Sequence, residues 1–218
     1  MINGNGKETY RQIRKIKGNL YAGRIYFKAA DTDGITVESA GTQEKLGFQA
    51  YEQDGVLYLR TNKIVIINSG MGKGSITVTM PEGQVFEEIH LFPKAAELHA
   101  DRLCADNLEV ENSAGQVCIQ NFSVKEARFE CGAGSLSGNG DAAERIEAVC
   151  GVGEVDLKLK GSRDDYNYDL ECGIGAIKCG GDQYSGIGRA VHLDHHASKK
   201  IKAACSIGQI NISYAAEL

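Results

Sequence analysis

The segment CGVGEVDLKL, residues 150–159, decides the fold, because four relatives of it recur in the second half of the chain. Each copy has an alternating apolar segment, a short corner that ends in glycine, and a second alternating segment. The relatives are NSAGQV from Asn112, CGAGSL from Cys131, CGIGAI from Cys172 and CSIGQI from Cys205. The shared glycines, at positions 115, 134, 153, 175 and 208, are 19, 19, 22 and 33 residues apart. A period of about 20 residues is typical of a solenoid.

Apolar residues recur at fixed distances from the shared glycine. They lie seven, five and three residues before it and two and four residues after it, with mostly polar or charged residues between them. This period of two on both sides of a corner predicts two half-buried strands per coil. The sequence therefore predicts an all-β fold, a single-domain parallel β-helix or β-solenoid with about 19–22 residues per coil. Right-handed winding is expected from the general preference for right-handed crossovers, and a third short side at Phe122 and Val124 stays open.

The strength of the pattern divides the chain into parts. In chain order we expect an N-terminal cap or frayed end at 1–19, a less regular solenoid stretch at 20–88, regular Gly-cornered coils at 89–214 and an insertion loop at 180–199, with the solenoid as a whole covering 20–218. A shorter insertion at 161–167 lengthens one coil by three residues. Insertions in a solenoid gather on one face, which is often the binding face.

Four of the seven cysteines occupy one column of the repeat, three residues before the glycine. On parallel rungs their Cβ atoms would lie about 4.8 Å apart and point the same way, whereas a disulfide prefers about 3.8 Å. We therefore expect free thiols that act as small core hydrophobes. A metal site at Cys131, Cys150 and Cys172 is disfavoured, because ligands in a straight column do not converge on an ion.

The composition argues against several classes of function. The net charge of −5 gives no overall basic footprint for nucleic acid, and no apolar run reaches the ~18 residues of a membrane span. No secretory signal is found, and reduced cysteines favour a cytoplasmic location. The repeated glycines do not match a dinucleotide-binding fingerprint, because strands follow them where that fingerprint opens a helix.

The longer insertion carries the candidate functional residues. Four residues there have donors that suit a metal ion, namely His192, Asp194, His195 and His196. Neither a helical frame nor a second cluster supports them, so an exposed loop without a metal is the preferred interpretation. Tyr184, Arg189 and His195 are the candidates for a binding face. No cofactor is expected.

The acidic residues around the shorter insertion allow a catalytic alternative. Polysaccharide-active enzymes combine paired carboxylates or a metal-held acid with a basic residue in one groove. Asp164, Asp165 and Asp169 lie near Arg163 in the sequence. Their surroundings have the composition of a turn, so we expect no catalytic residue and a protein that is not an enzyme.

Several strings of the chain resemble a known family. They are ITVESAG from Ile35, DGVLYLRT from Asp54, GKGSITVTMPEG from Gly72 and LEVENSAGQVCIQNF from Leu108. With the later Gly-cornered repeats, they look like the bacterial "putative adhesin" family, a domain of unknown function with a parallel β-solenoid fold, over roughly residues 20–214. The resemblance implies a role in adhesion or at the cell envelope, and it carries over no catalytic residue. The chain departs from the family pattern by its cysteine column and by lacking an anchor.

The leading hypothesis is a non-enzymatic interaction or adhesion-like scaffold whose partner is a protein or a glycan. One alternative is a polysaccharide-active lyase or hydrolase. The other is a structural protein that assembles through its solenoid ends, which an uncapped end at Tyr214 would promote. The chain is expected to be a monomer or a weak homo-oligomer, without a nucleic-acid partner and without a direct membrane span.

Overall fold

The computed structural model describes residues 1–41, 47–61 and 74–215. Strands make up most of this described part, and one short 3-10 helix, η2 at Arg163–Asp165, precedes β10. The strands are β1 Ile2–Asn3, β2 Gly6–Tyr10, β3 Lys15–Ala30, β4 Ile35–Ala40, β5 Gln49–Gln53, β6 Val56–Arg60, β7 Ser75–Pro81, β8 Phe86–Ala100, β9 Leu103–Lys160, β10 Tyr166–Cys179, β11 Asp182–Leu193 and β12 Lys199–Ala215.

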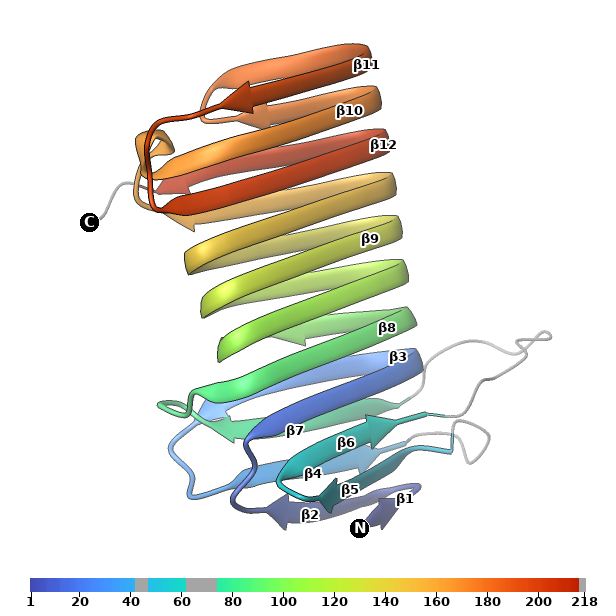
Figure 1. Cartoon of the computed structure of the whole chain (residues 1–218). Coiled ribbons are helices and arrows are strands. Elements are labelled where there is room, and N and C mark those ends of the chain that lie inside the picture. Colours follow the sequence, from blue (N-terminus) through green and yellow to red (C-terminus); the bar gives the residue numbers. More distant parts are fainter. Residues whose placement is uncertain (42–46, 62–73, 216–218) are drawn as a thin grey trace, which may run out of the picture.

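Stacked, flattened coils form the body of the molecule (Figure 1). β3 pairs with β8, β8 with β9, β9 with β12, and β12 with β10, and all four pairings are parallel. The strands bend around the corners without interruption, so β9 alone passes the corners at Gly115, Gly134 and Gly153. The predicted all-β parallel solenoid is confirmed.

The inward columns of the repeat build the core. Every residue seven, five or three positions before the corner glycine, and two or four positions after it, is buried in all five copies. Leu108, Ile146 and Ile201, for example, share one column and are at most 2% exposed. Each buried aliphatic side chain contributes about 1.5–3 kcal/mol to folding. The columns run through all coils and join one continuous hydrophobic cluster.

The corner glycines are required by backbone conformation and by close stacking. Gly153 has φ +142°, and a Cβ atom there would lie 2.1 Å from the carbonyl oxygen of Gly134. The same column extends to the first coil, where Gly23 has φ +112° and pairs in register with Ala96. The predicted role of the glycines as corner residues is therefore confirmed.

The coils do not stack in chain order. β12 lies between the last coil of β9 and β10, and β11 is the outermost strand (Figure 1). Cys205 consequently pairs in register with Cys150 on one side and with Cys172 on the other. The expectation that Tyr214 lies at an uncapped end of the solenoid is wrong for this reason, because Tyr214 belongs to an inner coil and pairs in register with Leu159.

The predicted loop at residues 180–199 is corrected to a hairpin followed by a short return. β11 runs antiparallel to β10 along its whole length. Gly180 and Gly181 both have positive φ and connect the paired ends Cys179 and Asp182, which is the geometry of a two-residue hairpin turn. Because this turn reverses the chain, the next repeat, β12, lies between β9 and β10 and does not add a new coil at the end of the stack.

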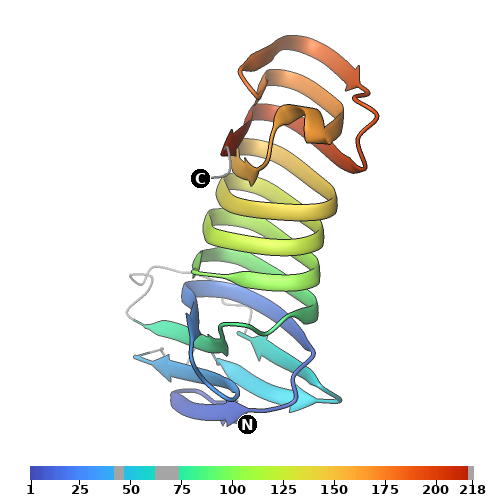
Figure 2. The same cartoon turned by 90° about the vertical axis from the view of Figure 1, so that its left-hand side faces the viewer.

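Antiparallel strands close the N-terminal end of the stack (Figure 2). Beneath β3, one half of the coil continues as β6, β5 and β1, and the other half continues as β7, β4 and β2. The expected boundary between residues 19 and 20 falls inside β3, since that strand begins at Lys15 and Ile16 is fully buried. The first coil therefore starts earlier than the repeat pattern predicts.

Candidate functional site

A file of exposed aliphatic side chains runs along one narrow edge of the solenoid. Val152, Ile207, Ile174 and Ile187 are 56%, 53%, 59% and 88% exposed. Backbone pairing places them in this order on successive rungs, Val152 opposite Ile207, Ile207 opposite Ile174, and Ile174 opposite Ile187. In the described chain the other large hydrophobic side chains with such exposure are Met1 and Val85. We call this file the aliphatic edge.

The corner motif explains why these side chains point outward. In Cys-Gly-x-Gly the cysteine is buried, and a Cβ atom on either glycine would clash with the backbone of an adjacent rung. A Cβ atom on Gly151 would lie 2.6 Å from the oxygen of Gly132. Residue x is therefore the side chain that the corner presents to solvent. Solvation alone would favour a polar residue there, so aliphatic residues on four successive rungs point to a contact surface.

A shallow groove lies beside the aliphatic edge, where the corner glycines leave no side chains. It has a volume of about 580 Å³, and its lining is formed by Gly134, Ser135, Gly153, Glu154, Gly175, Ala176, Gly208 and Gln209. In this groove two side-chain amides donate hydrogen bonds to Glu154 Oε1, from Gln209 Nε2 at 2.7 Å and from Asn211 Nδ2 at 2.9 Å. Ridge and groove therefore run side by side along the same edge, and both repeat once per rung.

A file of alternating charges runs along a broad face of the stack. Seven members lie six residues before the corner, and the eighth, His192, pairs in register with Asp169 from the antiparallel β11. In spatial order they are Lys17, His90, Glu109, Arg128, Glu147, Lys202, Asp169 and His192. Arg128 contacts Glu109 at 3.4 Å and Glu147 at 3.2 Å. Lys202 lies 4.0 Å from Glu147. We call this set the charged file; its charges are mostly paired within it or with neighbouring columns.

The three residues expected to form a binding face lie on or near the outermost hairpin. The Arg189 guanidinium lies 6.0 Å from the Tyr184 ring, and Arg189 takes the register position of the inward cysteine column, opposite Cys172. His195 lies after β11, its ring edge-on to Tyr168 at 5.7 Å. The structure thus brings Tyr184 and Arg189 together at the end of the stack and places His195 beside η2 and β10.

The four residues considered as metal ligands have separate partners. His192 Nδ1 lies 2.5 Å from Asp169 Oδ1, and Asp194 accepts a hydrogen bond from the backbone of His196. The backbone N–H of His195 donates to Asn167. His196 is 92% exposed and its Nδ1 lies 3.7 Å from Asp194. These side chains pair with neighbours and do not converge on one point.

The acidic residues considered for a catalytic site also have different roles in the structure. Asp165 caps η2 by accepting a hydrogen bond from the backbone of Ser162 at 2.7 Å. Lys200 and His192 donate to Asp169, and these hydrogen bonds lower the pKa of its carboxyl group. Asp164 is 89% exposed. Asp169 is therefore held as a carboxylate, which does not suit a general acid.

The cysteine column is lined up inside the solenoid, as the repeat predicts. The order in space is Cys131, Cys150, Cys205 and Cys172, and all four are at most 4% exposed. Burial, the largest cause, raises the pKa of the Cys150 thiol to about 12. The structure records all seven cysteines as free thiols. The column therefore acts as part of the core.

Sequence reasoning missed the aliphatic edge. The signal was present at position x of the corner, which reads Ala133, Val152, Ile174 and Ile207 in the last four repeats. In a solenoid repeat the inward columns predict the fold, whereas a single apolar residue in a corner is also compatible with an ordinary turn. Ile187 carried no such signal, because its place on the edge depends on the hairpin of β10 and β11.

The stacked parallel coils place the protein in the β-solenoid class. The family described as Toastrack DUF4097 matches residues 13–149, which is more than half of the chain. The chain belongs to this family.

Two solved structures resemble the chain along most of its length. One is described as a "putative cell adhesion protein" from Clostridium sporogenes, with 13% identity, a TM-score of 0.53 and coverage of 98% of this chain and 100% of the other. The second is a "putative adhesin" from Bacteroides fragilis, with 14% identity, a TM-score of 0.35 and coverage of 94% and 95%. The first of these supports the shared fold.

No curated protein matches the chain. Within the described residues the structure contains no helix with the length and apolar character that crossing a bilayer requires.

Proposed function

We propose that this chain is a non-enzymatic, adhesion-type scaffold that joins copies of itself side by side through the aliphatic edge. The observation that carries the proposal is the file of four aliphatic side chains, each more than half exposed, on adjacent rungs. Contiguous exposed apolar side chains of this kind are typical of protein contact sites. The description of one structural neighbour as a "putative cell adhesion protein" supports a role in binding.

A second copy is the partner that fits the edge best. The ridge of Val152, Ile207 and Ile174 lies beside a groove lined by Gly153, Gly208 and Gly175. A two-fold axis parallel to the stack brings the ridge of each copy against the groove of the other, so the contact is isologous. Ridge and groove share the rung spacing of about 4.8 Å, and the surface is therefore complementary to itself.

The ends of the solenoid are less suited to self-association than the aliphatic edge. At the C-terminal end, Arg189 places a charge at an inward position of the outermost strand, which is a known protection against edge-to-edge pairing. At the N-terminal end, the short β1 pairs with β5, and β2 pairs with β4. Side-by-side contact leaves these ends unchanged.

The edge is narrow, so the contact of one pair is weak. We expect a dissociation constant on the order of 10–1000 μM, as for small and transient interfaces. Weak contacts suffice for adhesion when many copies act together, because linked copies bind with a raised effective concentration.

Sedimentation velocity over a range of protein concentrations tests the proposal. The parent chain should shift toward dimer with concentration, and a Val152→Ser, Ile174→Ser, Ile207→Ser variant should remain monomeric. Val85→Ser is the matched control, because Val85 is 65% exposed away from the edge, and it should associate like the parent. A parent that stays monomeric at millimolar concentration, or a triple variant that dimerises equally well, contradicts the proposal.

A further inference from the structure

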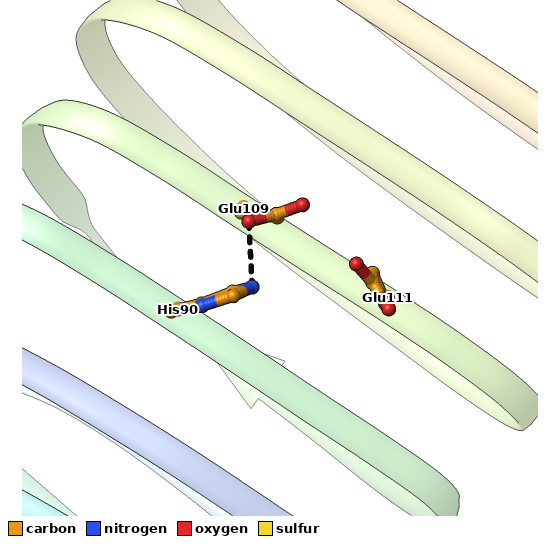
Figure 3. Close-up of side chains that lie close together, drawn as sticks. All are labelled: His90, Glu109 and Glu111. Atoms are coloured by element: carbon orange, nitrogen blue, oxygen red, sulfur yellow. Dashed lines mark ion pairs between the residues drawn. The ribbon is translucent and has the colours of Figure 1, made fainter.

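At the N-terminal part of the charged file, three side chains converge on one point. His90, Glu109 and Glu111 each offer one ligand atom, and these atoms all lie within 4.8 Å of one another. His90 belongs to β8 and stands opposite Glu109 of β9 in the parallel register. Figure 3 shows His90 and Glu109 reaching toward each other from adjacent rungs, with Glu111 beside them on the rung of Glu109.

The imidazole of His90 is held with Nε2 toward the carboxylates. Nε2 is buried and makes no well-aligned hydrogen bond in the described structure, although Glu109 Oε2 lies 2.6 Å away. On the other side of the ring, Nδ1 faces Glu88 Oε1 at 4.0 Å. The Phe92 ring packs against the imidazole, with the ring centroids 4.0 Å apart. The Phe92 ring and the carboxylates on either side therefore hold the ring with Nε2 toward Glu109.

Acidic side chains gather around the imidazole, and burial raises the pKa of the Glu111 carboxyl group. Arg128 approaches Glu109 through Oε1 at 3.4 Å, which leaves Oε2 on the side of His90. The same guanidinium also contacts Glu130 at 3.1 Å and Glu147 at 3.2 Å. One arginine is thus shared by three glutamates, of which Glu147 also contacts Arg145 and Lys202. Glu111 adds a further carboxyl group to the cluster. A divalent cation would balance this charge.

We propose that His90, Glu109 and Glu111 form a binding site for a divalent first-row transition cation, with Zn²⁺ as the representative ion. One imidazole nitrogen and two carboxylate oxygens are donors that Zn²⁺ accepts, whereas Ca²⁺ and Mg²⁺ prefer oxygen ligands alone. All three residues are partly exposed, so water can complete the coordination. The ion joins β8 to β9 and is separate from the aliphatic edge, so this proposal does not depend on self-association.

Calorimetric titration with Zn²⁺ of the whole, reduced chain tests the site. The parent should bind one equivalent, and His90→Ala and Glu111→Gln should each weaken binding by at least about tenfold. Glu130→Gln and His192→Ala are matched controls that remove a neighbouring carboxylate and another imidazole of the charged file, and both should bind like the parent. The absorption spectrum with Co²⁺ should lack a thiolate charge-transfer band, which separates this site from the cysteines.

Three results would overturn the proposal. They are a parent chain that binds no Zn²⁺, a His90→Ala variant that binds as well as the parent, and a Co²⁺ spectrum with thiolate ligation. Loss of binding in a His195→Ala variant, with His90→Ala unaffected, would also overturn it by placing the ion near β11. His90 and Glu111 are both partly exposed, so we expect these variants to fold. Circular dichroism and thermal melting of each variant separate lost ligation from lost folding.

Discussion

Single residues at the corners set how closely the rungs approach. Gly134 and Gly153 both have positive φ, and a Cβ atom on either would lie 2.1 Å from a carbonyl oxygen of the preceding rung. An L-residue is disfavoured by that backbone conformation, and the close oxygen leaves it no space. The sequence predicts this role correctly, because the glycine recurs at the same point of every copy.

Replacing Gly153 with valine should destabilise the protein strongly. The variant combines backbone strain with a clash against the next rung, so we expect a loss of at least about 3 kcal/mol in the free energy of unfolding. This corresponds to a melting temperature lower by about 6–12 °C for a chain of this size. Gly83→Val is the control, because a Cβ atom at Gly83 meets no atom within 4 Å. Equal melting temperatures for the two variants would count against the corner assignment.

Among the elements, β12 has the least expected position. The connection from β9 to β10 must climb two rungs to leave room for it, and the coil that contains this connection is 22 residues long where the earlier ones have 19. Three extra residues span up to about 10 Å, more than the additional rung spacing of about 4.8 Å. The three-residue insertion that precedes β10 is therefore explained by the topology.

Charge also favours the position of β12. Lys202 stands between Glu147 and Asp169 in the charged file. If the coils stacked in chain order, these two acids would be direct neighbours, and like charges on adjacent strands are destabilising. In the observed stacking order acidic and basic residues alternate here, whereas stacking in chain order would place two acidic residues side by side.

Reversing the charge of Lys202 should weaken the attachment of β12. Lys202→Glu places three acids on successive rungs, and we expect a loss of about 1 kcal/mol at low ionic strength, shrinking in 1 M salt because exposed charges are screened. Thermal melting at both salt concentrations measures this. Lys158→Glu carries the same charge change at an exposed position beyond the corner and is the control. A Lys202 variant as stable as the parent at low salt would argue against this electrostatic contribution.

The sequence predicts local structure here much better than topology. Alternation around Gly153 identifies strands, corner and buried face, since these depend on residues within a few positions of each other. The position of β12 in the stack depends on the hairpin turn at Gly180 and Gly181 and on contacts between residues far apart in sequence. The repeat alone cannot distinguish the possible stacking orders, because every coil carries nearly the same inward columns. Ile187 could not be assigned to the aliphatic edge from the sequence either, because its place there depends on the hairpin of β10 and β11.

For the molecule as a whole, the stacking order of β9, β12, β10 and β11 determines the surfaces of the C-terminal half. The aliphatic edge is continuous because Ile207 lies between Val152 and Ile174. The cysteine column and the charged file pass through β12 in the same way. The strands at both ends of the stack differ from the regular coils. A surface that repeats from rung to rung, such as the aliphatic edge, therefore lies along the side of the solenoid.

The most direct test of the account is an NMR experiment on protein with labelled isoleucine, leucine and valine methyl groups. Ile210 pairs in register with Val155 on β9 and with Ile177 on β10. We therefore predict strong cross-peaks from the methyl groups of Ile210 to those of both Val155 and Ile177. A strong cross-peak between Val155 and Ile177, with Ile210 contacting Ile177 alone, would show coils stacked in chain order and would contradict the account.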